Sequence, residues 1–286
     1  MFRSPYILNY IHSILYLCIT TYSYNILWNI GYHPSESSSN KILLTETYEP
    51  PINPILVSII FGWSLYSISG IGHDAVHGSF SPSKKVNRIV SFLMMDMGPT
   101  GSAKNWKHYH NKIHHQSLHS PEDRMRLYST YVIKEWWILI RDTWMLGEPG
   151  IFKIPLAYLI LQIPYYLIPF VYLSFFFSVG YLAYLPHSLP TIYRDQPKMN
   201  TRLHHFDYSW DIFPDSHLLN FLTGSLNIHA SHHCYPQATR SSLMTYAKSL
   251  EARYPDRYRS IKTWKEFKYF WSHRHETTNK RPHFID

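Results

Sequence analysis

The chain has 286 residues, which suits one large domain, and 45% of them are hydrophobic and 17% aromatic. A net charge of +8 is compatible with a nucleic-acid partner, but no recognition module is visible and the basic residues gather beside apolar segments, as in cytoplasmic loops of membrane proteins. The only two cysteines, Cys18 and Cys234, lie far apart in the chain, which argues against a disulfide framework and indicates a reducing compartment.

Four segments are predicted as membrane spans. Residues 6–30 contain no Lys, Arg, Asp or Glu, and neither do residues 54–72, so each can cross a bilayer as one helix. The later apolar stretch contains prolines and is too long for one straight span, so we interpret it as a hairpin of two short spans at 150–168 and 169–186. The predicted fold is all-α, a polytopic membrane protein with about four transmembrane helices.

Histidines form three clusters, the first of them directly after the second predicted span. The clusters are His73-Asp-Ala-Val-His77, His110-Asn-Lys-Ile-His114-His115 and His229-Ala-Ser-His232-His233. Residues three or four apart share one face of a helix, so the spacing predicts that the two histidines of the first cluster face one metal, and likewise the three of the last. In the second cluster His110 and His114 share a face, and His115, turned by about 100°, can reach a neighbouring metal.

The three clusters together supply eight imidazoles, more than one zinc ion uses. Eight suit two metals with open positions, and imidazole is a good ligand for iron, although ligand softness alone leaves zinc and copper open. The Glu-x-x-His pattern of soluble di-iron bundles is absent from the sequence. Six other histidines are expected at interfacial or surface positions: His12, His33, His217, His273, His275 and His283.

Two independent constraints indicate on which side of the membrane the histidine clusters lie. If the clusters share a metal site, the chain between them must cross the membrane an even number of times, which the hairpin satisfies. Basic residues also favour the cytoplasmic side for residues 73–149 and 187–286. We therefore expect one domain, 1–286, in which these two regions form a cytosolic helical cap that holds the metals.

The clusters resemble the three histidine boxes of the membrane fatty acid desaturase and hydroxylase superfamily, whose pattern is HX(3–4)H, HX(2–3)HH and (H/Q)X(2–3)HH. The resemblance covers about residues 54–260. The run from Gly72 to Phe80 is similar to the HDxxHGS run of acyl-lipid desaturases, and the run from Asn227 to Pro236 is similar to their NxHxxHHxxP. Trp106 before the second box and Asp123 after it also fit the family.

The resemblance implies that the eight box histidines bind two irons and that O2 is the co-substrate. It also implies a ninth nitrogen near the end of the fourth span, for which we choose His187; His204, four residues after Asn200, is the competitor. Beyond these metal ligands we expect no catalytic residue. The run from Tyr184 to His187 and the first box also resemble carotenoid ketolases, so a ketolase or lipid hydroxylase stays open beside an acyl-chain desaturase.

Partners and supporting residues can also be predicted. Carboxylates that accept hydrogen bonds from the ligand rings should orient them, and the candidates are Asp74, Asp123, Asp207 and Asp211. The sequence contains no haem motif of a fused cytochrome b5 and no nicotinamide fingerprint, so electrons should come from a separate ferredoxin or cytochrome b5 with its reductase. The other partners expected are a lipid or acyl substrate and the membrane itself, the endoplasmic reticulum in a eukaryote or the inner membrane in a bacterium.

Overall fold

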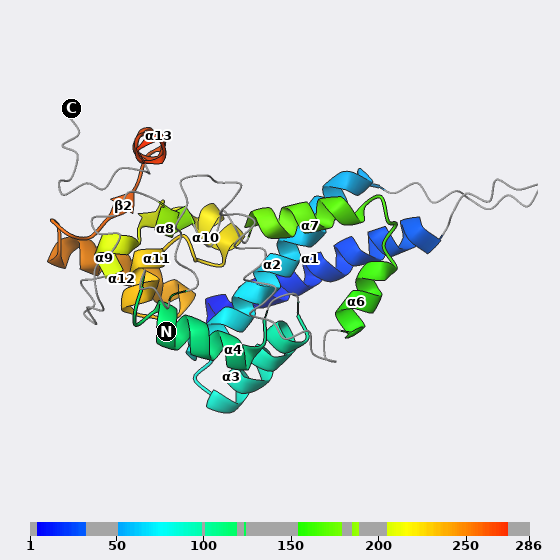
Figure 1. The fold of residues 1–286 in the computed structure, drawn as a ribbon, viewed down its shortest axis with the longest axis horizontal. Helices are drawn as coiled ribbons and strands as arrows, with labels where there is room; N and C mark the ends of the chain where they lie inside the picture. Colours follow the sequence, from blue (N-terminus) through cyan, green and yellow to red (C-terminus); the bar gives the residue numbers. More distant parts are fainter. Residues whose placement is uncertain are drawn as a thin grey trace, which may run out of the picture.

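A computed structural model of the chain describes residues 5–32, 51–98, 101–118, 123, 154–178, 185–188 and 205–273. These residues are mostly helical, in agreement with the predicted all-α class (Figure 1). The α-helices are α1 (Ile7–Tyr32), α2 (Pro54–His77), α3 (Lys84–Ser91), α4 (Ala103–Trp106), α6 (Ile154–Leu161), α7 (Ile168–Phe177), α8 (Leu185–Ser188), α9 (His205–Tyr208), α10 (His217–Thr223), α11 (His229–Cys234), α12 (Arg240–Arg253) and α13 (Trp264–Ser272). Two π-helices, η1 (Phe92–Asp96) and η2 (Lys107–His114), and two short strands, β1 (Asp211–Ile212) and β2 (Ser260–Ile261), complete the described part.

Helix α2 has well-defined signals at both ends. Asn53 precedes it and accepts a hydrogen bond from the backbone N–H of Ile55, while Pro54 occupies the first turn, where a missing N–H costs nothing. At the other end Gly78 has a φ of 80°, a left-handed conformation that favours glycine, and its N–H bonds back to the last turn. The helix therefore stops directly after His77.

The predicted membrane spans agree with the observed helix bounds to different degrees. Helix α1 covers the predicted span 6–30, but α2 runs past the predicted end at residue 72, so the first histidine box lies on its last turns instead of after it. Within the described residues, α2 is the one helix both long and apolar enough to cross a membrane. Helices α6 and α7 lie almost entirely within the two spans predicted for the hairpin, which extend beyond the described residues. The number of crossings stays a prediction.

Helices α1, α2 and α7 pack around one hydrophobic core. Its buried residues are Ile26, Leu27, Val57, Phe61, Leu65, Tyr66, Ile163, Leu167, Val171, Phe175 and Leu226. The backbones of α2 and α7 approach closely at Gly62, where an added Cβ would lie 2.2 Å from the carbonyl oxygen of Val171. Trp63 Nε1 and the hydroxyl of Tyr66 donate to carbonyls at the end of α10. These bonds fix α2 against the part of the chain that carries the third box.

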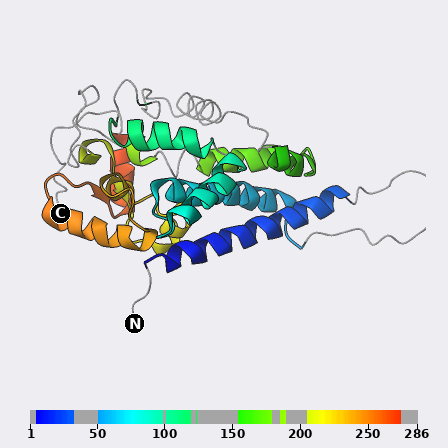
Figure 2. The same cartoon turned by 90° about the horizontal axis from the view of Figure 1, so that it is seen from below.

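The C-terminal helices form a second layer at one end of the long helices (Figure 1). Strands β1 and β2 pair in parallel, with Asp211 opposite Ser260, and β1 also bridges to Ile228 at the start of α11. Helices α11 and α12 share a core that includes Phe206 and Tyr258. In Figure 2 the N-terminal end of α1 lies next to α12, where Arg240 N–H donates to Asn9 Oδ1 at 3.3 Å.

His12 departs from its expected interfacial or surface position. Its side chain is buried, and its ring lies 5.2 Å from that of Phe221 and 5.9 Å from that of Tyr16. The reason is that Asn9, His12 and Tyr16 follow a three- to four-residue spacing along the face of α1 that packs against the rest of the chain.

Candidate metal centre

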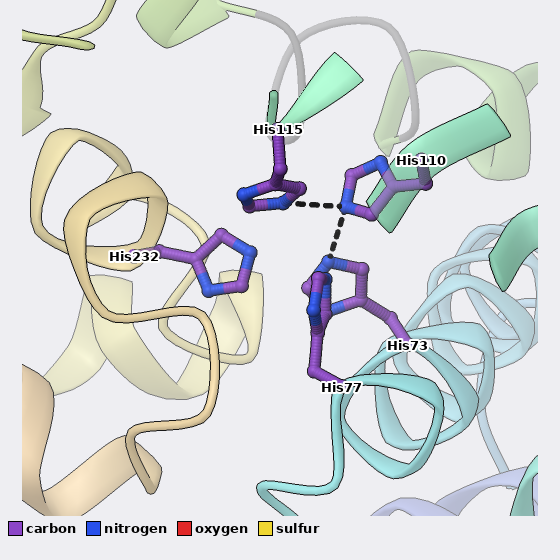
Figure 3. Close-up of side chains that lie close together, drawn as sticks. All are labelled: His73, His77, His110, His115 and His232. Atoms are coloured by element: carbon purple, nitrogen blue, oxygen red, sulfur yellow. Dashed lines mark hydrogen bonds between the residues drawn. The ribbon is translucent and has the colours of Figure 1, made fainter. Parts of the chain in front are cut away.

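The predicted histidines come together in two adjacent buried groups. Within each group, one ligand atom from each residue lies within 4.8 Å of all the others. The five-histidine group consists of His73, His77, His110, His115 and His232, and the four-histidine group of His114, His187, His229 and His233. Figure 3 shows the rings of the five-histidine group turned toward one another from α2, from the second box and from α11.

The spacing of the ring nitrogens is that of metal ligands. In the five-histidine group, Nε2 of His110 lies 3.0 Å from Nε2 of His73 and 3.1 Å from Nε2 of His115. In the four-histidine group, Nε2 of His229 lies 2.6 Å from Nε2 of His187. Two nitrogens bound at right angles to one ion, each at about 2.1 Å, lie about 3 Å apart. Each group can therefore converge on one ion.

The second box divides between the two groups because it lies on a π-helix. The N–H of His115 donates to the carbonyl of His110 at 2.9 Å, a bond that spans five residues instead of four. This wider turn places His115 beside His110 in the five-histidine group, while His114 faces the four-histidine group. His110 and His114 were predicted to share a helix face, and their rings do stack with centroids 5.1 Å apart. They nevertheless belong to different groups, and His115, not His114, is the member of the second box that joins His110.

The third box also serves both groups. His229 and His233, one helical turn apart on α11, belong to the four-histidine group, whereas His232 belongs to the five-histidine group. Successive residues of an α-helix differ by about 100° in direction, so His232 and His233 leave the helix on different flanks. The prediction that all three face one metal is wrong, because α11 lies between the groups. His73 and His77, on the last turns of α2, share one group as predicted.

The ionisation of the rings fits metal binding. Burial, with a further contribution from neighbouring rings, lowers the pKa of most of them well below the usual value, among them His110, His115, His229, His232 and His233. Neutral imidazole is the form that binds a metal. Nε2 of His77 and of His232 are buried and have no hydrogen-bond partner among the described residues. Such orphaned nitrogens are costly, and an ion in the five-histidine group would satisfy both.

Two of the predicted carboxylates contact ligand rings directly. Asp123 is buried, and its oxygens lie 3.1 and 3.2 Å from Nδ1 of His114. Asp74 Oδ1 lies 3.3 Å from Nδ1 of His73. A carboxylate that accepts from Nδ1–H fixes the tautomer in which the Nε2 lone pair faces the metal. The side chain of the third candidate, Asp207, lies outside the described residues.

Asp211, the fourth candidate, acts on the helix instead of on a ring. Its Oδ1 accepts from the backbone N–H of Ser231 at 3.1 Å, and its Oδ2 accepts from the hydroxyls of Ser231 and Tyr258. Burial raises the pKa of Asp211 to about 6 against the opposing effect of these bonds. Because Ser231 lies between the histidines of the third box, this carboxylate fixes the position of α11.

Comparison with known proteins identifies the family. The family model described as fatty acid desaturase matches residues 50–149 and 133–265, which together include all nine histidines of the two groups. The chain belongs to the fatty acid desaturase family. No curated protein matches it. Family membership makes the protein an oxidoreductase of the lipid desaturase and hydroxylase type.

The structure of this member of the fatty acid desaturase family also places residues whose role the sequence left open or did not reveal. His187 lies in the four-histidine group, and its Nδ1 lies 3.1 Å from the carbonyl oxygen of Tyr208. Its competitor His204 lies outside the described residues, as does Asn200. Trp106, noted beside the second box, stacks on the ring of His110 with centroids 4.8 Å apart.

Sequence reasoning missed Tyr258 and Arg240, which hold Asp211 and Asp74 respectively. No local pattern could have identified them, because each is distant in sequence from the carboxylate it contacts. Cys234 is buried in the core that α11 and α12 share.

Proposed function

We propose that the protein is an O2-dependent di-iron desaturase that introduces a double bond into the acyl chain of a lipid. The observation that carries this proposal is the pair of buried, all-imidazole groups in a chain of the desaturase family. The nine proposed iron ligands are the members of those two groups. The alternative is a carotenoid ketolase or lipid hydroxylase, which the resemblance of the first box and of the run ending at His187 keeps open.

The two groups are contiguous, which supports two ions acting as one centre. The rings of His115 and His233, one from each group, stack with centroids 4.2 Å apart. The rings of His110 and His114 stack at 5.1 Å across the same boundary. Two irons held by these residues would therefore lie close enough together to act as one centre.

Removal of hydrogen from a methylene group determines what the protein must contribute. An unactivated C–H bond has no acidic proton, so general acid–base residues cannot break it. Two irons, when bound, supply O2 reduction and the oxidising power that removes one hydrogen from each of two adjacent carbons. The protein orients the ligands, through contacts such as that of Asp123 with His114, and holds the substrate in register. Hydroxylation needs the same arrangement and differs in the fate of the oxygen.

The electron balance supports a separate donor. Reduction of O2 to two waters takes four electrons, of which desaturation of the substrate supplies two, so two more must come from outside. The basic residues of the C-terminal region, including the exposed Arg253 and Lys265, offer a docking surface for an acidic ferredoxin or cytochrome b5. The same charges would also attract anionic lipid. We place them, with both histidine-rich regions, on the cytoplasmic side of a multi-pass membrane protein.

Lipid analysis of expressing cells tests the function. The chain and its His233→Ala variant are produced in a host without polyunsaturated lipids and in a second host that supplies β-carotene. We expect new unsaturated fatty acids with the parent chain and none with the variant, at equal amounts of membrane-inserted protein. Oxygenated carotenoids with unchanged fatty acids would overturn the desaturase in favour of the ketolase.

A further inference from the structure

One buried arginine stands beside the five-histidine group. Arg240 opens helix α12 and is 3% exposed, and its Nε donates to Asp74 Oδ2 at 2.7 Å. Removing two charges from water is expensive, and a buried ion pair is often no better for stability than an apolar pair of the same size. Stability is therefore a poor explanation for this pair, and its position suggests another.

The carboxylate of Asp74 connects the arginine to a metal ligand. Its second oxygen, Oδ1, lies 3.3 Å from Nδ1 of His73. The other ring nitrogen of His73, Nε2, lies 3.0 Å from Nε2 of His110 inside the five-histidine group. Arg240, Asp74 and His73 thus form a chain of contacts in which one carboxylate oxygen faces the guanidinium and the other faces the ring.

We infer that Arg240 is a positioning residue for the metal site of the five-histidine group, an inference that rests on the proposed di-iron function. The guanidinium fixes the rotamer of Asp74 and keeps its negative charge in place. Asp74 in turn accepts from Nδ1–H of His73 and holds the Nε2 lone pair on the metal side. Without the guanidinium, the carboxylate of Asp74 would lose the contact that fixes its rotamer, and His73 would lose its orientation.

The surroundings of Arg240 hold the guanidinium in one place. Its Nη1 lies 3.5 Å from the hydroxyl of Tyr16, and its Cζ lies 5.7 Å from the centre of that ring. Gly224 has a φ of 61°, and a Cβ there would lie 3.2 Å from Nη2 of the arginine. A Cβ at Gly70 would lie 3.7 Å from the same atom. The two glycines leave a space that the flat guanidinium fills, so the side chain meets Asp74 in a fixed direction.

A role limited to tying helices together would give a different result from positioning. The side chain of Arg240 also joins α12 to α1 through its contact with Tyr16, so loss of stability alone would not distinguish the two. The two roles differ in which of the two proposed iron sites a substitution of Arg240 changes. Positioning acts only on the group that contains His73, whereas Asp123 supports the other group through His114. Asp123→Asn is therefore the matched control, and Tyr16→Phe is a second control that alters the surroundings of Arg240 but not Asp74.

The experiment uses full-length chain loaded with ⁵⁷Fe and reduced, with Mössbauer spectra and iron content measured after dialysis against a chelator. We expect Arg240→Gln and Asp74→Asn to alter the same quadrupole doublet and to weaken iron binding at that site about 10- to 100-fold. Asp123→Asn should alter the other doublet, and Tyr16→Phe, which leaves the contact of Nε with Asp74 in place, should alter the first doublet less than Arg240→Gln does. If Arg240→Gln does not fold, Arg240→Lys, which keeps the charge without the Nε contact, should show a smaller change in the same doublet.

An unchanged spectrum and iron content in the folded Arg240 variants would overturn the inference. So would a change in the doublet that Asp123→Asn alters, because the effect would then not pass through His73. Failure of the proposed function looks different: the parent chain itself would bind no iron, and the inference would fall with it.

Discussion

Removing the Tyr258 hydroxyl is expected to weaken the attachment of α11 by an amount that depends on pH. This hydroxyl and that of Ser231 both donate to Asp211 Oδ2, and all three residues are buried. Burial and the nearby Asp211 raise the pKa of Tyr258, so it remains a donor at every usable pH. At pH 8 the carboxylate, whose pKa is about 6, is charged. A hydrogen bond to a charged group contributes about 1.5–3 kcal/mol.

The predicted magnitude can be measured by thermal unfolding in detergent. Tyr258→Phe should lower Tm at pH 8 by about 3–12 °C, at about 2–4 °C for each kcal/mol. At pH 5 Asp211 is protonated, the lost bond is between neutral groups and contributes about 0.5–1.5 kcal/mol, and the fall in Tm should shrink to about 1–6 °C. Tyr246→Phe, which alters a partly exposed tyrosine on α12, is the control.

Equal Tm values for Tyr258→Phe and Tyr246→Phe at pH 8 would refute this reasoning. A penalty that does not shrink at pH 5 would show instead that Asp211 is not the partner whose charge matters. The pH dependence of the stability of the parent chain is an independent check, because it depends on the same carboxyl group of Asp211. Because Asp211 holds its proton more tightly in the folded chain than in the unfolded one, it favours folding at low pH, and that contribution is lost as pH rises from about 4 to about 6.

Four further outcomes are expected. Elemental analysis should find about two irons per chain, and a result of one zinc and no iron would contradict this. His232→Ala should reduce iron binding at the five-histidine group at least about 10-fold and abolish activity. Gly62→Ala should separate α2 from α7 and cost about 1–3 kcal/mol in thermal unfolding. Turnover should require an added ferredoxin or cytochrome b5 and its reductase, so activity with NADH alone would contradict the proposed donor. Labelling of introduced cysteines should find position 280 on the cytoplasmic side of the membrane and position 40 on the opposite side.

The sequence predicted the members of the site better than their arrangement. Histidine spacing identified each box, because repeated imidazoles at three- or four-residue intervals are readable without a structure. The division between the two groups was not readable, since it depends on the π-helical turn at His110 and on the placement of α11 between the groups. Backbone hydrogen bonding of this kind is set by packing, and the amino-acid pattern of η2 gives no sign of it.

The long helices were predicted well at their starts and less well at their ends. Absence of charge located α1 and α2, but α2 continues through the polar residues His73 and Asp74 because they are buried against the C-terminal layer. The supporting contacts were beyond prediction for a related reason. Arg240 and Asp74 are 166 residues apart, and no local pattern connects two residues at that separation.

The bond between Asn9 and Arg240 also limits how early during translation the protein can assemble. The two residues are 231 positions apart, so the start of α1 is made long before the segment that it contacts. At about 5–20 residues per second, a ribosome needs about 12–46 s to synthesise that interval. In the later part of this interval, after residue 115 has been added, the first and second boxes exist without the third, and neither group has all its imidazoles. Neither proposed iron site can therefore be complete before α11 is translated, so a ribosome-bound chain that ends before α11 should bind iron less tightly than the full chain.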